Sequence, residues 1–286
     1  MKTALFNLEN LATQAAMVKV IEANKDSIKM VLVSHPYSKK NGSFLFQLYR
    51  NLKLRGLSFV HYLSCKMVLM PFYRFILRLL QQPYLPSLKT LCLQHNIIYM
   101  KVKDVNDKKV VDKLSALDID LIQIFYFDQI LQQTIIDTPN IGVINYHPAY
   151  LPQCRGLFPI LFSYLYNKKK YGISAHWVEN PEIDAGPLIE QVAVKFSDKN
   201  NLLETDAAVC AHFEGLYAQV QILLSNVLEE NYNDKRRHII ESLSKSRQSM
   251  GSYYSYPSKQ ELALLRHSGL SLSSFFSGFK LLVKPQ

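Results

Sequence analysis

Continuous apolar runs of strand length recur along this chain, and stretches with helical spacing of their apolar residues separate them. The strand-like runs cover residues 2–8, 29–36, 97–102, 120–127 and 142–147. The helix-like stretches cover residues 12–24, 86–96 and 106–118. Uninterrupted apolar runs are typical of strands that helices bury on both faces. The alternation therefore predicts an α/β fold with an open, mostly parallel, Rossmann-like sheet and helices on both faces.

The second half of the chain continues the alternation. It predicts a helix at 157–167, strands at 172–178 and 188–196, and one long helix from about Thr205 to Leu228. With 286 residues, 48% of them hydrophobic, the chain is long enough to bury a large core. We expect one domain over residues 1–230 and a small, mainly helical C-terminal appendage over 231–286, where Ser258 caps a helix at 259–267.

Cysteine usage and the start of the chain suggest a compartment. The cysteines are Cys65, Cys92, Cys154 and Cys210, and no CxxC pair occurs among them. This spacing favours buried thiols over a disulfide framework or a zinc ribbon. The opening residues, MKTALFNLEN, are too short in their apolar run for a signal peptide. We therefore expect a cytoplasmic protein without a metal site.

The net charge of +10 comes from one segment. No acidic residue lies between Asp26 and Asp104, whereas that stretch holds twelve of the 33 Lys and Arg residues. Within it, residues 44–82 mix aromatic and long aliphatic side chains with basic ones, and Arg74 and Arg78 lie one helical turn apart. This pattern predicts an inserted basic amphipathic helical segment. Three roles stay open: a solvated helical pair packed on the domain, peripheral contact with an anionic membrane at its inner face, or, less favoured, nucleic-acid binding.

Three polar residues suggest chemistry at one edge of the sheet. Asn145 and His147 end a predicted strand, and ligands of such sheets bind beyond the carboxyl ends of the strands. Asp184 follows one helix and one strand later, in an Ile-Asp-Ala-Gly-Pro turn. A carboxylate beside an imidazole suits general acid–base work, and an amide supplies a donor for a developing oxyanion. The alternative is that Asn145 and His147 only form turn hydrogen bonds before Pro148.

These motifs resemble the folate-dependent formyltransferases, which include the methionyl-tRNA, glycinamide ribonucleotide and sugar-nucleotide enzymes. The resemblance rests on NYHPAYLPQCRG, from Asn145 to Gly156, and on the later IDAGP, from Ile183 to Pro187. It covers roughly residues 97–228. The first strand–helix turn, FNLENLAT, departs from the family because it lacks the Gly-Ser-Asn phosphate loop of the glycinamide ribonucleotide enzymes.

The resemblance implies formyl transfer from 10-formyltetrahydrofolate to a primary amine. In that scheme Asn145 and protonated His147 stabilise the oxyanion, and Asp184 holds His147 and passes protons toward the departing folate nitrogen. Two segments then match folate-binding residues of the family. The implied folate-binding residues are Phe127, Gln129, Ile130, Leu131, Ala149, Tyr150, Leu151 and Pro152.

Several points stay open at this level. The amine acceptor is an amino sugar, an aminolipid, or an amine bound to a carrier or to tRNA. A 10-formyltetrahydrofolate hydrolase, or a non-catalytic relative that binds membrane or nucleic acid, are the alternative functions. The resemblance also suggests that His176 packs behind the catalytic residues or in the core and does not take part in the reaction. The sequence does not indicate the oligomeric state.

Overall fold

A seven-stranded sheet forms the centre of the computed structural model, which describes residues 1–35, 43–195, 201–228, 235–246, 248 and 251–284. The strand order is β3-β2-β1-β4-β5-β7-β8. These strands are β1 (Thr3–Asn7), β2 (Ile28–Ser34), β3 (Ile98–Val102), β4 (Leu121–Phe125), β5 (Gly142–His147), β7 (Tyr171–Trp177) and β8 (Leu188–Val194). From β3 to β5 all neighbours are parallel, and β7 runs antiparallel to β5 and β8. The prediction of an open, mostly parallel sheet is confirmed.

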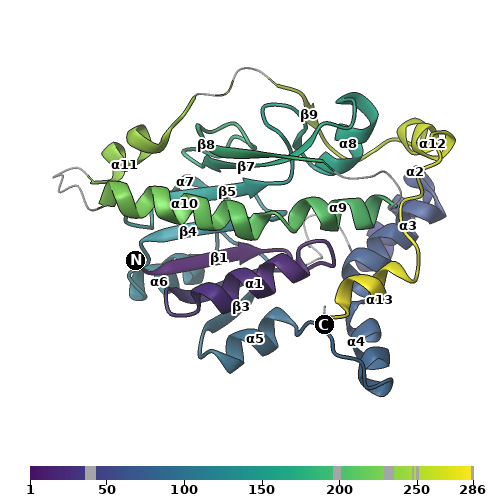
Figure 1. Cartoon of the computed structure of the whole chain (residues 1–286), viewed down its shortest axis with the longest axis horizontal. Coiled ribbons are helices and arrows are strands. Elements are labelled where there is room, and N and C mark those ends of the chain that lie inside the picture. Colours follow the sequence, from purple (N-terminus) through teal and green to yellow (C-terminus); the bar gives the residue numbers. More distant parts are fainter. Residues whose placement is uncertain (36–42, 196–200, 229–234, 247, 249–250, 285–286) are drawn as a thin grey trace.

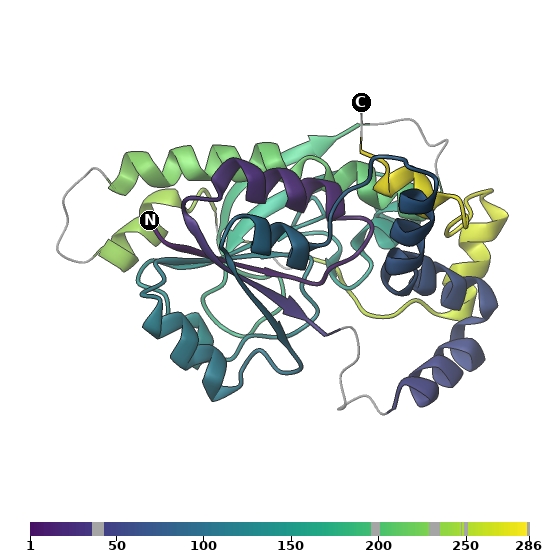
Figure 2. The ribbon, with the colours of Figure 1, turned by 90° about the horizontal axis from the view of Figure 1, so that it is seen from below.

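Helices cover both faces of the sheet, as predicted (Figures 1 and 2). One face carries α1 (Gln14–Asn24), α5 (Leu88–Gln94) and α10 (Phe213–Leu228), and the other carries α6 (Lys108–Ala116) and α7 (Gln133–Ile136). Strand β1 shows why both faces need cover. Leu5 packs into the cluster of the first face, whereas Ala4 and Phe6 pack into that of the second.

The carboxyl ends of β1, β4 and β5 meet at one edge of the sheet. The strand order reverses beside β1, because β1 is paired with β2 on one side and with β4 on the other. Loops that leave the sheet at such a reversal diverge and leave a crevice for ligands. The edge therefore brings together the loop after Asn7, the loop after Phe125 and the end of β5 at His147.

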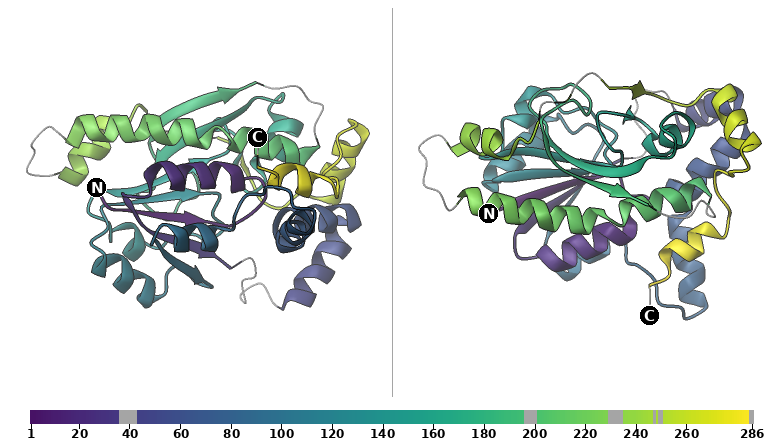
Figure 3. Two further views of the ribbon diagram at one scale, coloured as in Figure 1. Left: turned by 60° about the horizontal axis from the view of Figure 1, so that its bottom comes forward. Right: turned by 45° about the horizontal axis from the view of Figure 1, so that its top comes forward.

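The predicted helical insertion at 44–82 consists of several short helices rather than one amphipathic helix. They are α2 (Phe44–Arg55), α3 (Leu57–Leu63), the π-helix η2 (Ser64–Val68) and α4 (Met70–Leu79). Together they stand at one end of the sheet (Figure 3). The expected basic face was wrong at Arg74, whose side chain is only 14% exposed and pairs with Glu9 at 3.3 Å. Arg78 is exposed, as expected.

The C-terminal elements lie against the rest of the chain (Figure 1). They are α11 (Lys235–Leu243), β9 (Tyr253–Tyr254), α12 (Lys259–His267) and α13 (Ser277–Leu282). Ser258 caps α12 in a capping box with Glu261, so the predicted cap is confirmed. Strand β9 pairs with the short strand β6 (Arg155–Gly156), while α13 packs on α4. The predicted boundary at residues 230 and 231 lies outside the described residues and stays a prediction.

Two predicted elements differ in detail. The long helix expected from Thr205 is two helices, α9 (Leu202–Cys210) and α10, because the His212 amide bonds back to Val209 and interrupts the regular helical ladder. Helix α5 begins after Ser87, whose side chain caps it, so Pro86 precedes the cap. Helix α8 (Pro159–Tyr166) matches the predicted segment. Within the described ranges, no helix combines the length and the apolar character needed to cross a bilayer.

Candidate active site

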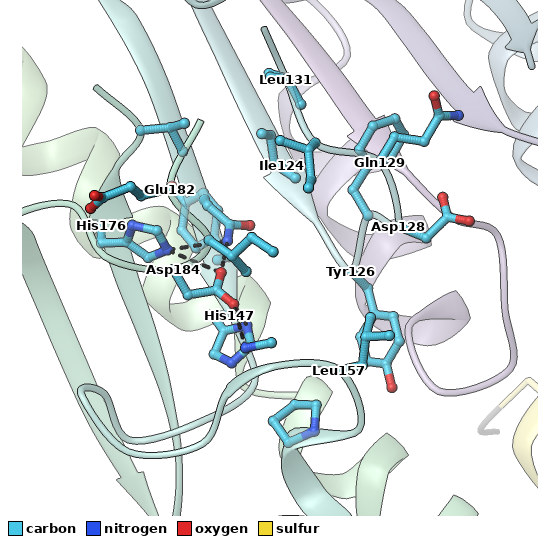
Figure 4. A pocket seen from close by; sticks show the side chains of 18 of the residues that line it. Ile124, Tyr126, Asp128, Gln129, Leu131, His147, Leu157, His176, Glu182 and Asp184 are labelled. Carbon is cyan, nitrogen blue, oxygen red and sulfur yellow. Dashed lines mark hydrogen bonds and ion pairs between the residues drawn. The ribbon is translucent and has the colours of Figure 1, made fainter. Parts of the chain in front are cut away.

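The structure brings together the three predicted catalytic side chains. His147 ends β5, and its Nδ1 lies 3.4 Å from Asp184 Oδ2. Asn145, two residues earlier, donates from its amide nitrogen to Asp184 Oδ1 at 2.8 Å. The adjacent strand β7 adds His176, whose Nε2 lies 3.6 Å from the same Oδ1 (Figure 4). Asp184 is therefore the centre of the cluster, with an imidazole beside each of its oxygens.

The turn that carries Asp184 is held against the end of β7. Asp184 has a left-handed backbone (φ 50°), a conformation that Asp tolerates better than most residues. Gly186 follows, and a Cβ atom there would lie 1.8 Å from the Trp177 carbonyl oxygen. The Trp177 amide closes the turn by donating to the Pro187 carbonyl at 2.9 Å. The Ile-Asp-Ala-Gly-Pro motif thus fixes the direction of the carboxylate through its glycine.

The Arg-Gly pair of the earlier motif clamps the same turn. Arg155 Nε donates to the Ile183 carbonyl at 3.0 Å, and the Gly156 amide donates to Asp184 Oδ2 at 2.9 Å. Because Arg155 and Gly156 form β6, which pairs with β9, the C-terminal segment supports the clamp. The Arg-Gly pair was part of the family motif, but no role was predicted for it. Its place in the same motif as His147 was the only indication that it belongs to the site.

Asp184 is held in its ionised form. Burial alone would raise its pKa, but the charges of His147 and His176 and the hydrogen bonds around it lower the pKa of Asp184 well below its ordinary value of 3.8. The side chain is only 8% exposed. The carboxylate is therefore a weak base, better suited to holding positive charge on a neighbour than to taking up a proton.

The two histidines have different hydrogen-bond partners. His147 has its Nδ1 toward Asp184 and its Nε2 at 3.0 Å from the Cys154 carbonyl, so both nitrogens face oxygens that only accept. A ring protonated at both nitrogens satisfies both contacts. In His176, Nδ1 lies 2.9 Å from the Trp177 carbonyl and Nε2 lies 3.1 Å from the Asn145 amide nitrogen. Nδ1–H can donate to the Trp177 carbonyl, whereas Nε2 faces both the Asn145 amide nitrogen and Asp184 Oδ1.

A cavity of about 170 Å³ opens beside this cluster. His147, Asp184 and His176 form one wall, and Tyr126 to Leu131 lie opposite them (Figure 4). The predicted folate-binding residues Phe127, Gln129, Ile130 and Leu131 therefore all line the cavity. The Gln129 side chain turns away, because its amide group bonds to the Val105 amide and to Ser34 Oγ.

The other predicted folate-binding segment, Ala149 to Pro152, is not among the lining residues of this cavity. Hydrogen bonds hold the segment against β7 and β8 instead. Ser174 Oγ donates to the Ala149 carbonyl at 2.7 Å, and Gln191 donates to the Leu151 carbonyl at 2.9 Å. Tyr150 lies under the Lys170 ammonium group, and the carbonyl of Pro152 faces Gly251. Pro148, the residue directly before this segment, does line the cavity.

A second buried carboxylate, Asp206 on α9, lies near the far side of the Tyr126 loop. Its partner is Lys66 of η2, and the two side chains are only 4% and 2% exposed. Lys66 also donates to the hydroxyl groups of Tyr62 and Tyr126. Burial opposes the charge on Lys66, yet the Asp206 carboxylate raises the pKa of Lys66 well above its ordinary value. The sequence marks Lys66 only as one of the basic residues between Asp26 and Asp104, and nothing near it in the chain indicates a carboxylate partner.

No cysteine serves as an activated nucleophile in this arrangement. Cys154 is buried beside His147, and burial raises the pKa of its thiol. A thiol in this state is a poor nucleophile at neutral pH. The cluster therefore combines an imidazole, an amide and a carboxylate, a set of groups that suits acyl transfer to an external nucleophile.

Comparison with known proteins agrees with this chemistry. A formyl transferase family model matches residues 77–217. Over these residues, just under half of the chain, the sequence is similar to the formyl transferase family. Methionyl-tRNA formyltransferase of Bacillus subtilis is 36% identical over 117 residues, which are 41% of this chain and 37% of that protein. The bifunctional polymyxin resistance protein ArnA of Wigglesworthia glossinidia brevipalpis is 29% identical over 154 residues, 53% of this chain and 22% of that protein.

Solved structures show the same formyltransferase fold. Phosphoribosylglycinamide formyltransferase from Anaplasma phagocytophilum has a TM-score of 0.53 and 16% identity, and the match covers 88% of this chain and 98% of that chain. The enzyme from Bacillus halodurans has a TM-score of 0.52 and 18% identity, with 78% and 96% covered. At this identity the likeness concerns the fold. The chain matches little more than a third of the length of methionyl-tRNA formyltransferase, so the family alone leaves its acceptor open.

Proposed function

We propose that this chain transfers a formyl group from 10-formyltetrahydrofolate to a primary amine. The observation that carries the proposal is the convergence of Asn145, His147 and Asp184 on the wall of a cavity whose opposite wall is the loop 126–131. The match of residues 77–217 to the formyl transferase family model supports the same reaction.

The loop 126–131 suits a flat heteroaromatic ring with donors and acceptors at its edge. Among the described residues, the backbone N–H and C=O groups of Phe127 and Gln129 make no hydrogen bond, whereas the Asn106 side chain bonds to the Ile130 carbonyl and the Gln132 amide. Apolar side chains of Ile124 and Leu131 line the cavity beside them. These residues would hold the pterin end of the donor, and the bound donor supplies the formyl carbon and the leaving nitrogen.

In this proposal His147 carries the positive charge that stabilises the transition state. When the amine attacks, negative charge develops on the formyl oxygen, and an imidazolium and an amide nitrogen on the cavity wall lower its energy. The Asn145 amide nitrogen donates to Asp184 and faces His176. To donate to the formyl oxygen it exchanges the His176 contact, which is the longer of the two.

Asp184 acts through His147 rather than as the base. Its lowered pKa keeps it charged, so it holds the imidazolium in place and fixes the ring orientation. The proton lost by the amine then reaches the folate nitrogen through His147 or through water. This assignment modifies the expectation that Asp184 passes the proton itself.

The test is formyl transfer by the purified chain with 10-formyltetrahydrofolate and a panel of amines. His147→Ala should lower the rate at least ~100-fold, on the scale of a positioned acid–base group. The matched control is His212→Ala. His212 is an exposed histidine in the turn between α9 and α10, so this variant should keep wild-type activity. Activity of the His147 variant within a few-fold of wild type would refute the assignment. Release of formate without any amine product would replace transfer with hydrolysis.

We also propose that the inserted helices contact an anionic membrane. Helix α4 exposes Phe72, Phe75 and Leu79, spaced on one helical face, with Arg78 next to them. The ring of Phe275 lies 6.1 Å from that of Phe72 and extends the apolar surface. Since residues 27–103 contain no acid, nothing in that segment repels an anionic surface.

Vesicle co-sedimentation tests the membrane proposal. The variant Phe75→Ser with Arg78→Glu should pellet several-fold less than wild type with phosphatidylserine vesicles, because it loses apolar contact and reverses a charge worth about 1 kcal/mol near the surface. Leu93→Ser on α5 is the control, because Leu93 is 68% exposed against 63% for Phe75, and it should pellet like wild type. Equal pelleting of all three proteins would remove the proposal.

A further inference from the structure

A second cavity, of about 210 Å³, lies at the point where the strand order of the sheet reverses. Leu8 and Asn10, just after β1, and Tyr126 to Asp128, just after β4, form its floor. The inserted helices complete it with Leu48, Val60 and Met67. Ligands of open α/β sheets bind at this kind of crevice. The position therefore marks a ligand site distinct from the cavity beside His147.

The two cavities share a wall. Tyr126, Phe127, Asp128, Leu157 and Phe158 line both of them. This wall includes part of the loop 126–131, which is proposed to hold the formyl donor. A molecule in the second cavity therefore lies on the other side of that loop from the cavity beside His147. The shared wall makes the second cavity the place from which an acceptor reaches the formyl group.

The chemistry of the second cavity is mostly apolar. Among its described lining residues, Lys66 is the only cation, and its ammonium group is already bonded to Asp206, Tyr62 and Tyr126. The Asn10 side chain is also fully used, because it bonds to Leu8, Thr13 and Ala12. These walls therefore offer no available cation or Asn10 amide to a diphosphate, which a nucleotide-linked acceptor would need.

Asp128 supplies the opposite charge. It is an acidic residue on the shared wall, and its carboxylate points away from the His147–Asp184 side of the first cavity (Figure 4). A carboxylate at the edge of an apolar cavity recognises a group that is cationic at one end and apolar along its body. A primary amine is such a group at neutral pH.

We propose that the second cavity binds the acceptor, and that the acceptor is a primary amine carried on an apolar body. This proposal rests on the proposed formyl transfer. Asp128 pairs with the ammonium group as the acceptor binds. For transfer, the amine leaves this carboxylate toward the formyl carbon and loses one proton to water. The neutral nitrogen then bonds to the formyl carbon, the bond from that carbon to the folate nitrogen breaks, and the second amine proton ends on the folate nitrogen.

The second cavity is shaped by helices that the formyl transferase family model does not match. Its helical wall, from Gln47 to Val68, lies outside residues 77–217, which match the family model. The cavity beside His147 is lined by residues from Ile124 to Asp184, inside the matched segment, with Tyr253 added from the C-terminal segment. The reacting groups thus belong to the family segment, whereas the insertion sets the acceptor.

An alkylamine series tests the proposal. With 10-formyltetrahydrofolate, kcat/KM should rise about fourfold for each methylene from butylamine to octylamine, the equivalent of ~0.8 kcal/mol per buried methylene. A sugar nucleotide with one primary amine should react more slowly than octylamine. Rates that do not depend on chain length, or preference for the sugar nucleotide, would overturn the assignment.

Binding without the donor separates the site from the reaction. Calorimetric titration with octylamine should show at least tenfold weaker binding to Leu48→Trp, which fills the cavity. Leu54→Trp, an exposed position of the same helix, should bind like wild type. Asp128→Asn should weaken octylamine about tenfold and leave octanol unchanged, since octanol keeps the chain without the charge. Equal octylamine affinity in all variants would refute the site.

The combined outcomes distinguish the two proposals. If octylamine binds with this variant pattern and no amine is formylated, the site is upheld and the formyl-transfer function fails. If the sugar nucleotide is formylated and octylamine does not bind, formyl transfer is upheld and the apolar-amine site fails.

Discussion

Two buried carboxylates, Asp184 and Asp206, sit on opposite sides of the Tyr126 loop and differ in what surrounds them. Asp184 is bounded by two imidazoles, an amide nitrogen and a peptide amide, and it faces a cavity. Asp206 is paired with the ammonium group of Lys66, accepts from the Tyr126 hydroxyl at 2.8 Å, and is only 1% exposed. Both carboxylates are therefore buried and negatively charged. They differ in whether a molecule in a cavity can reach them.

The difference teaches how burial relates to function in this fold. Asp184 lies beside a cavity, and its partners are two imidazoles and an amide group. Because these groups can exchange protons or rotate, Asp184 can respond to a bound molecule. Asp206 of α9 is instead buried against the permanent cation of Lys66 on η2 and the Tyr126 hydroxyl. This cluster is a joint that holds the insertion against the core. Tyr126 connects the two regions, because its hydroxyl group belongs to the Asp206 cluster while its ring and backbone line both cavities.

The largest effect is expected on the transfer rate when Asp184 is substituted. Asp184→Asn keeps the shape and removes the negative charge beside His147 Nδ1, so the transfer rate should fall by ~10²–10⁴-fold. Asp206→Asn is the matched variant and should lose stability while keeping a rate within about tenfold of wild type. Steady-state kinetics on both proteins, with thermal unfolding, would measure the contrast. Similar rate losses in the two variants would show that the two carboxylates are not separate in function.

The next effect concerns stability at the Lys66 joint. Lys66→Met leaves the Asp206 carboxylate buried without its cation and should lower the free energy of unfolding by ~3–5 kcal/mol in urea titration. Adding Asp206→Leu should restore part of that loss, since no lone charge then remains buried. The exposed pair of Lys108 with Asp112 is the control, and Lys108→Met should cost under ~1 kcal/mol. A double variant no more stable than the single one would contradict this account of the joint.

The smallest effect is the pH dependence of stability that Asp184 contributes. The pKa of Asp184 is lower in the folded chain than its ordinary value of 3.8, so the folded state is favoured above about pH 4. That contribution is lost as the pH falls toward the folded pKa, with a slope of at most about 1.4 kcal/mol per pH unit. Unfolding of wild type and Asp184→Asn between neutral and acid pH should converge at low pH. Parallel curves would show that the folded-state pKa is not lowered.

The sequence predicted much of the fold and of the candidate site because those features depend on local patterns. The apolar run at 120–127 predicted β4, and Ser258 predicted the start of α12. The order Asn145, His147, Asp184 also followed from short motifs. By contrast, the break between α9 and α10 left no such signal, because apolar helical spacing continues across His212.

Side-chain partners far apart in the chain could not be predicted. Arg74 was expected on the basic face of the insertion but pairs with Glu9. No pattern in the sequence indicated that Lys66 is buried against Asp206. Spacing within a helix shows which residues share a face, yet it does not show what covers that face. For the same reason Ala149 to Pro152 were expected at the cavity, although Ser174 and Gln191 hold that segment elsewhere.

By itself, the sequence determined the alternation of strands and helices and the residue types able to stabilise a charged transition state. Both are set by neighbours a few positions away, through backbone geometry and side-chain chemistry. The tertiary structure alone decided which carboxylate meets imidazoles beside a cavity and which is sealed against a lysine. That choice depends on contacts between residues 37 and 140 positions apart, which form only when the sheet brings the loops together.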